Sequence, residues 1–345
     1  MPDSASSAEH VAHVDRRRAE IGALLALAAG IAVAVQGRVS GEMSLRMGSS
    51  IAAAIVAFSI SLLTLGLIVA VRPATRLRVR HDLPDLVHSA FRRGGDPGVT
   101  RRARQRKHHS IQWWQLLGGL GGATFVSVQG LAVPLLGVAL FSVVLVASTT
   151  ASSLVVDRFG IGPGGLRPVT RVRVGAAIGT TLAVLLAVSG RLSAQNFAVG
   201  AVLLTLVAGA GSTVQQAVNG QVSVRMGDPV VAAIVNFSVG YVALIVTLTA
   251  LELGGVVHAV LPPSPWSEPV VWTSGLIGVF FVVVSAYVVR TLGLLMFSLY
   301  SICGSLLGSL ALDLALPSPG TLVDGRLIAG IVLTLATLSF AAWRR

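Results

Sequence analysis

Long apolar blocks separated by short polar breaks dominate the chain. Each block is close to 20 residues long, and together they occupy residues 21–39, 50–71, 112–133, 136–156, 173–190, 197–217, 230–251, 270–289, 292–312 and 327–343. A helix needs about 20 apolar residues to cross the ~30 Å hydrocarbon core of a bilayer. The pattern therefore predicts an all-α integral membrane protein with ten transmembrane helices.

The composition agrees with this prediction. The chain is 54% hydrophobic and 12% charged, with a mean hydropathy of +0.81, whereas soluble domains carry about 25% charge. The net charge of +12 could indicate nucleic-acid binding, but the arginines cluster between apolar blocks, as in loops beside an anionic membrane face. We expect no nucleic-acid partner. We expect residues 1–20 to be a disordered, cytoplasmic N-terminus, and block 21–39 to be a retained helix.

The basic residues predict the orientation in the membrane. With a cytoplasmic N-terminus, 22 of the 26 Lys and Arg residues fall on the cytoplasmic side. The outer side then holds only Arg38, Arg46, Arg191 and Arg326. Cytoplasmic loops carry an excess of Lys and Arg, so this split predicts a multi-pass protein with both termini in the cytoplasm.

The sequence also repeats internally. Residues 36–59 (QGRVSGEMSLRMGSSIAAAIVAFS) align without a gap with residues 215–238 (QQAVNGQVSVRMGDPVVAAIVNFS), at a shift of 215 − 36 = 179 and with 13 of 24 positions identical. A weaker match at a shift of 156 pairs Phe141–Ser142 with Phe297–Ser298, and Asp157 with Asp313. Five spans separate the two copies, so they cross the membrane in opposite directions. We predict two inverted five-helix repeats, residues 21–190 and 191–345, an arrangement typical of secondary transporters.

The repeated motif resembles that of a known family. Gln-x-x-Val-(Asn/Ser)-Gly, followed by Met-Gly and Ala-Ala-x-x-x-Phe-Ser, occurs in both copies. It is similar to the YdcZ-type branch of the drug/metabolite transporter superfamily, across residues 20–343. The resemblance implies a fused ten-helix exporter in the inner membrane and names no substrate.

Polar side chains within the repeat are the candidates for a substrate path. If residues 21–46 form one helix, Gln36, Ser40 and Ser44 share one face at spacings of four. The second copy repeats this stripe, with Gln215, Asn219 and Ser223. Amides are unfavourable in hydrocarbon, so both stripes should face the bundle interior. They either line a path or hydrogen-bond helices together.

Four further positions near the motif need an interpretation. Asn236 is a deep amide whose repeat mate is Ala57, so it either selects substrate or packs helices. Arg46 and Arg225 precede Met-Gly at the expected helix ends, as anchors or gates, and Asp228 could pair with Arg225. Glycines at 48 and 227 should end these helices. Weaker candidates in spans three and eight are Gln129 and Tyr287.

Titratable chemistry is scarce in the expected spans. None of the fourteen acidic residues lies at the middle of a span, so Glu42 is the nearest candidate for ion coupling, and Asp157 and Asp313 should be structural. The single cysteine, Cys303, allows no cysteine cluster. We expect no metal, no cofactor and no ATP-binding loop.

Residues 72–110 form the longest break and carry eleven Lys and Arg residues. Leu83, Leu86, Val87, Ala90 and Phe91 have helical spacing, which predicts a short amphipathic helix on the cytoplasmic membrane face, where the loop would bind anionic lipid.

These features favour a secondary transporter that moves an unidentified small molecule by alternating access. A non-transporting membrane scaffold is the alternative, and a membrane enzyme ranks lower because no catalytic cluster is evident. The small-xxx-small pairs Gly118/Gly122 and Gly304/Gly308 indicate helix packing within the chain, with a homodimer as the other interpretation.

Overall fold

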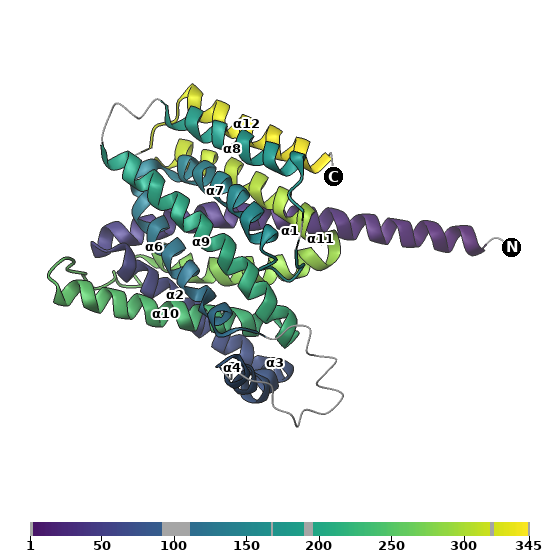
Figure 1. Cartoon of the computed structure of the whole chain (residues 1–345), viewed down its shortest axis with the longest axis horizontal. Coiled ribbons are helices and arrows are strands. Elements are labelled where there is room, and N and C mark those ends of the chain that lie inside the picture. Colours follow the sequence, from purple (N-terminus) through teal and green to yellow (C-terminus); the bar gives the residue numbers. More distant parts are fainter. Residues whose placement is uncertain (1–2, 92–110, 167, 190–195, 318–320, 344–345) are drawn as a thin grey trace.

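The computed structural model describes residues 3–91, 111–166, 168–189, 196–317 and 321–343, and all regular elements in these ranges are helical (Figure 1). The elements are α1 (Asp3–Met47), α2 (Ser50–Val71), α3 (Pro73–Leu77), η1 (Arg78–Asp82), α4 (Leu83–Phe91), η3 (Trp113–Leu117), α6 (Gly118–Leu136), α7 (Val138–Arg158), α8 (Arg171–Val188), α9 (Asn196–Met226), α10 (Pro229–Leu253), η4 (Pro269–Thr273), α11 (Ser274–Ala315) and α12 (Gly325–Trp343).

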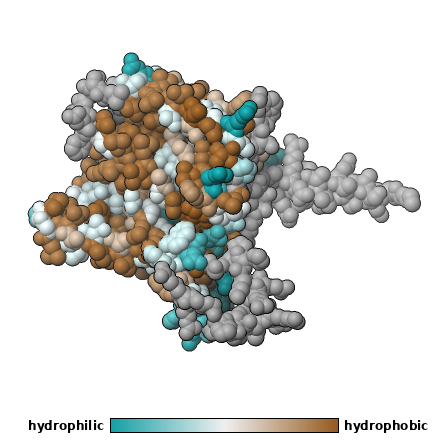
Figure 2. Space-filling model, viewed as in Figure 1, coloured by the Kyte–Doolittle hydropathy of each residue, from teal (hydrophilic) through white to brown (hydrophobic). Residues whose placement is uncertain are grey.

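Length and hydropathy make this an α-helical membrane protein. In the described ranges, eight helices are long and apolar enough to cross a bilayer, and two shorter apolar helices, Pro269–Ser285 and Gly325–Ala341, correspond to the expected spans 270–289 and 327–343. Hydrophobic residues cover most of the coloured surface of the bundle in Figure 2. Large aliphatic side chains such as Leu63 and Leu67 are mostly exposed, as suits a surface that faces lipid.

The two copies of the motif end their helices in the same way. α1 ends at Met47 and α9 at Met226, because Gly48 (φ 63°) and Gly227 (φ 64°) adopt the left-handed conformation that terminates a helix. The expected helix over residues 21–46 and both glycine stops are therefore confirmed. α1 begins at Asp3, well before the first apolar block.

Residue contacts show that α11 reverses direction along its length. Its first part runs antiparallel to α1, since Ser274 contacts Ser40 while Val284 and Val288 pack with Ala26 and Ala29. Its last part runs parallel to α1, where Gly304 lies against Leu27 and Gly308 against Ile31. The reversal falls between Val288 and Phe297, so α11 supplies two arms that both pack along α1.

The N-terminal and C-terminal helices interleave. α1 packs along both arms of α11, while α9 packs on α6 and α7; α2 contacts α10, and α8 contacts α12. The last described turn of α12 and the N-terminal part of α1 lie on the same side of the bundle (Figure 1). The most extensive helix packing therefore joins the two halves, and α7 also packs on α8 and α1 on α6 within the first half.

The segment between α2 and α6 docks on the bundle. Leu86 and Ala90 of α4 are buried against Met226 of α9 and Val231 of α10. The expected short helix is present; Leu86 and Ala90 of its apolar face pack on protein, whereas Val87 and Phe91 are exposed. The end of α9 and the start of α10 supply the apolar side chains that these two buried residues contact. Most of the basic run expected to bind lipid falls at 92–110, outside the described residues.

Candidate functional site

Three amide side chains form a hydrogen-bonded cluster between α9 and α10. Asn236 is 5% exposed, and its Oδ1 accepts hydrogen bonds from Gln215 Nε2 at 2.9 Å and Asn219 Nδ2 at 3.0 Å. We call Gln215, Asn219 and Asn236 the amide cluster. The sequence identified all three residues, and the structure brings them together.

Glycines of α6 make room for the amide cluster. A Cβ atom at Gly122 would lie 2.6 Å from Gln215 Nε2, and one at Gly118 would lie 2.9 Å from Asn219 Oδ1. A larger residue at either position would push α6 away from the amides. The expected packing role of Gly118 and Gly122 is therefore confirmed, and their partners are the amides.

The first copy of the stripe is buried, whereas Gln215 and Asn219 of the second copy are half-buried. Ser40 Oγ lies 2.7 Å from Ser274 Oγ of α11, and Gln36 packs beside Gly278 of the same helix. Ser44 packs against Gly130 of α6. We call Gln36, Ser40 and Ser274 the serine cluster. Ser223, the counterpart of Ser44, is half-buried on α9.

An aromatic pair joins the two halves near these clusters. The rings of Phe58 (α2) and Phe237 (α10) meet edge-to-face, with centroids 5.0 Å apart and planes at 72°. Phe58 also faces Gly240 beside the amide cluster, and Phe237 lies near Gly278 beside the serine cluster. The pair therefore sits between the two polar clusters, a placement that hydropathy alone does not indicate.

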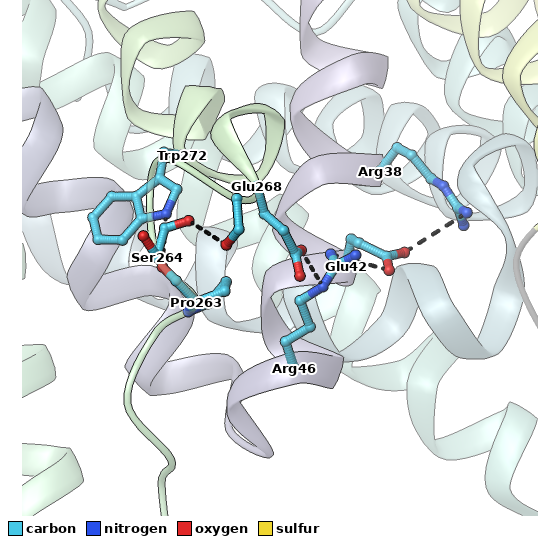
Figure 3. Close-up of polar contacts among 8 residues, drawn as sticks. Arg38, Glu42, Arg46, Pro263, Ser264, Glu268 and Trp272 are labelled. Atoms are coloured by element: carbon cyan, nitrogen blue, oxygen red, sulfur yellow. Dashed lines mark hydrogen bonds and ion pairs between the residues drawn. The ribbon is translucent and has the colours of Figure 1, made fainter.

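A chain of ion pairs covers the end of the bundle where α1 terminates, here called the Met47 end. Glu42 lies 3.8 Å from Arg38 and 3.1 Å from Arg46, and Arg46 Nε lies 2.5 Å from Glu268 Oε2 (Figure 3). Glu268 belongs to the α10–α11 connection, which also donates a backbone hydrogen bond from Val260 to the carbonyl of Met47. Arg46 therefore links α1 to the C-terminal half.

The opposite, Met226 end has its own link between the halves. Asp228 caps α10 by accepting from Val230 N at 2.9 Å, and its other oxygen accepts from Thr75 Oγ1 at 2.8 Å and Arg78 at 3.2 Å. The expected Arg225–Asp228 pair is wrong. The turn at Gly227 directs Asp228 towards α10 and the docked α3–η1 segment, while Arg225 stays half-buried at the end of α9.

The two matched aspartates have structural contacts. Asp313 is 3% exposed and accepts hydrogen bonds from the backbone N–H groups of Val138 and Ala139, which cap α7 after the break at Gly137. Asp157 forms an ion pair with Arg173. A carboxylate at a helix N-terminus is favoured by the helix dipole, which explains the burial of Asp313.

The arrangement offers hydrogen bonding inside the bundle and charge at its ends. In the described residues, no group of three or more His, Cys, Asp or Glu side chains could hold a metal ion. Sequence reasoning missed Phe58, Phe237 and the docking of Arg78, since these depend on which helices meet. The side chain of Tyr287 lies outside the described part of the chain.

These features define a class of protein: a multi-pass helical membrane protein whose halves interleave and hold paired polar clusters between them. Within that class, the chain belongs to the family described as "Putative inner membrane exporter, YdcZ", whose model matches residues 21–89, 97–192 and 200–340. The resemblance seen in the repeated motif is confirmed. The protein is thus a membrane protein of an exporter family, which implies transport rather than enzymatic activity.

None of the curated proteins matches the chain. One solved structure, described as "Crystal structure of protein", is 16% identical, covers 94% of this chain and 96% of its own, and has a TM-score of 0.49.

Proposed function

We propose that the protein is a secondary transporter that exports a small molecule across the inner membrane by alternating access. One observation carries this proposal. Contacts between helices of one half recur between the equivalent residues of the other half, where equivalent residues are 179 or 156 positions apart in the sequence. Gly119 packs against the backbone of Asn236 and Gly240, and Gly275 packs against that of Ala57 and Ser61. The differences are 275 − 119 = 156, 236 − 57 = 179 and 240 − 61 = 179.

Other contacts follow the same rule. Gly122 faces Gln215 and Gly278 faces Gln36, while Gly118 faces Asn219 and Ser274 bonds to Ser40. The Phe58–Phe237 pair joins equivalent residues, since 237 − 58 = 179. Matched contacts of this kind support two inverted five-helix repeats and, with α11 as two arms, ten crossings. Such halves can exchange conformations about a shared site.

The ends of the chain support the proposed orientation. α12 ends on the same side of the bundle as the N-terminal part of α1 (Figure 1), as an even number of crossings requires. α4, which precedes the strongly basic stretch, docks against Met226 at the end of α9. The positive-inside rule then makes the Met226 end cytoplasmic and the Met47 end external.

The proposed path runs from the amide cluster, past the aromatic pair, to the serine cluster. Buried amides and hydroxyls can exchange their mutual hydrogen bonds for bonds to a substrate at little net cost. Arg46–Glu268 and Arg78–Asp228 link the halves at opposite ends. We propose that these two links open alternately. The Arg46–Glu268 pair is about one-third exposed, so the energy needed to break it is small.

Transport in sealed vesicles, assayed against a metabolite panel, tests this function. Asn236→Ala removes the shared acceptor of the amide cluster and should lower transport about tenfold or more, since a lost hydrogen bond to a polar substrate is worth ~1.5 kcal/mol. Thr334→Val is the control, because Thr334 is buried in α12 and bonds only its own helix at Gly330. Unchanged transport in folded Asn236→Ala would contradict the path, and no transport by the native protein would favour a scaffold.

A further inference from the structure

Gln129 of α6 carries a buried amide oxygen without a partner. The side chain is 1% exposed, and within the described part of the chain no group hydrogen-bonds to its Oε1. An unsatisfied buried acceptor is unfavourable by about 1–3 kcal/mol. Native proteins rarely keep such a group unless a ligand or water satisfies it.

Gln129 lies at the proposed path. A Cβ atom at Gly37 would be 3.0 Å from Gln129 Nε2, so the amide lies over Gly37, the residue after Gln36 in α1. Gln36 is itself 8% exposed, with no hydrogen bond to any described residue, and it faces Gly278, which Phe237 also approaches. Two buried amides without partners therefore project from adjoining positions of α1 and α6.

The groups around these amides carry no charge. The serine cluster offers hydroxyls, and Phe237 offers an aromatic ring. The nearest charged side chains on α1, Arg38 and Glu42, pair with each other and with Arg46 at the Met47 end. An ion held beside Gln129 would lose its hydration without gaining a counter-charge, which is strongly unfavourable.

We propose that Gln129, together with Gln36, binds the substrate, and that the substrate is an uncharged molecule with an amide or hydroxyl group. This rests on the proposed transport function. A primary amide presents one acceptor and one donor edge, so its best complement is another amide or a hydroxyl. The body of the ligand would face Phe58 and Phe237.

The test uses the sign of the stability change. Gln129→Leu and Gln129→Met remove an unpaired buried amide, so each should keep or raise the thermal unfolding midpoint while lowering transport at least about tenfold. Ser127→Ala is the matched control, because Ser127 Oγ is also buried and unpaired but lies two residues away, on a different face of α6. It should keep both stability and transport.

Three probes of similar size test the substrate class: benzamide, benzoate and benzylammonium. Benzamide should raise the unfolding midpoint of the purified native protein and not that of Gln129→Leu; the two ions should raise neither. Stabilisation by the ions, or an equal response of Gln129→Leu, would overturn the proposal. Misfolding of both Gln129 variants would do so too, because it would reveal a structural role. Benzamide binding without any transport by the native protein would refute the proposed function and leave the binding site standing.

Discussion

Gly119→Ala and Gly275→Ala, made separately, should lower the stability of the protein to the same degree. A Cβ atom at Gly119 would lie 2.2 Å from the carbonyl oxygen of Asn236, and one at Gly275 would lie 2.3 Å from that of Ala57. Ordinary contact begins near 3.4 Å, so α6 would have to move about 1 Å from α10, and α11 about 1 Å from α2. Overpacking of this kind is unfavourable by about 1–3 kcal/mol.

Thermal unfolding of purified protein in detergent measures this effect. We expect both variants to unfold a few degrees below the native protein, because about 2 kcal/mol displaces the midpoint by that amount in a chain of this size. Gly66→Ala in α2 and Gly175→Ala in α8 are controls, since neither Cβ would meet another atom within 4 Å. A strong effect at Gly119 with a control-like result at Gly275 would refute the reasoning from matched contacts.

Three further substitutions test the ends of the bundle. Asp313→Asn removes a carboxylate that accepts two backbone hydrogen bonds and should lower stability by about 1–3 kcal/mol in the same assay; no change would argue against its capping role. Asp228→Ala removes a helix cap and the partner of Arg78. It should speed hydrogen exchange over residues 73–91, and native-like protection there would contradict the docking. Glu268→Gln should change stability by less than about 1 kcal/mol because the Arg46–Glu268 pair is half-exposed, and a larger loss would show that the pair holds the fold.

The sequence predicted the features that depend on local chemistry. Hydropathy located the helices, and Gly48 and Gly227 ended α1 and α9 where the Met-Gly motif predicts, because a left-handed turn favours glycine wherever it occurs. The polar stripes predicted that Gln36 and Ser40 would be buried. Each of these inferences depends only on the conformation or environment that a residue and its neighbours in the sequence favour.

Features that depend on which helices meet could not be read from the sequence. Asp228 has Arg225 three residues away, yet it pairs with Arg78, which is 150 residues earlier in the chain. Asn236 joins Gln215 and Asn219 only because α9 and α10 cross at that level. The helical spacing of Leu86 and Ala90 predicted an apolar face but not that these two side chains would pack on Met226 and Val231.

Side-specific labelling of one cysteine tests alternating access most directly. Asn219→Cys, in a chain whose native Cys303 is replaced by serine, reports on the amide cluster through its reaction with a membrane-impermeant thiol reagent. A second pair of cysteines cross-links one end of the bundle or the other, either Arg46→Cys with Glu268→Cys or Arg78→Cys with Asp228→Cys. Cross-linking the Met47 end should leave the reporter reactive only from the cytoplasmic side, and cross-linking the Met226 end only from outside. Reactivity that does not change with the end that is cross-linked would contradict two halves that alternately open a shared path.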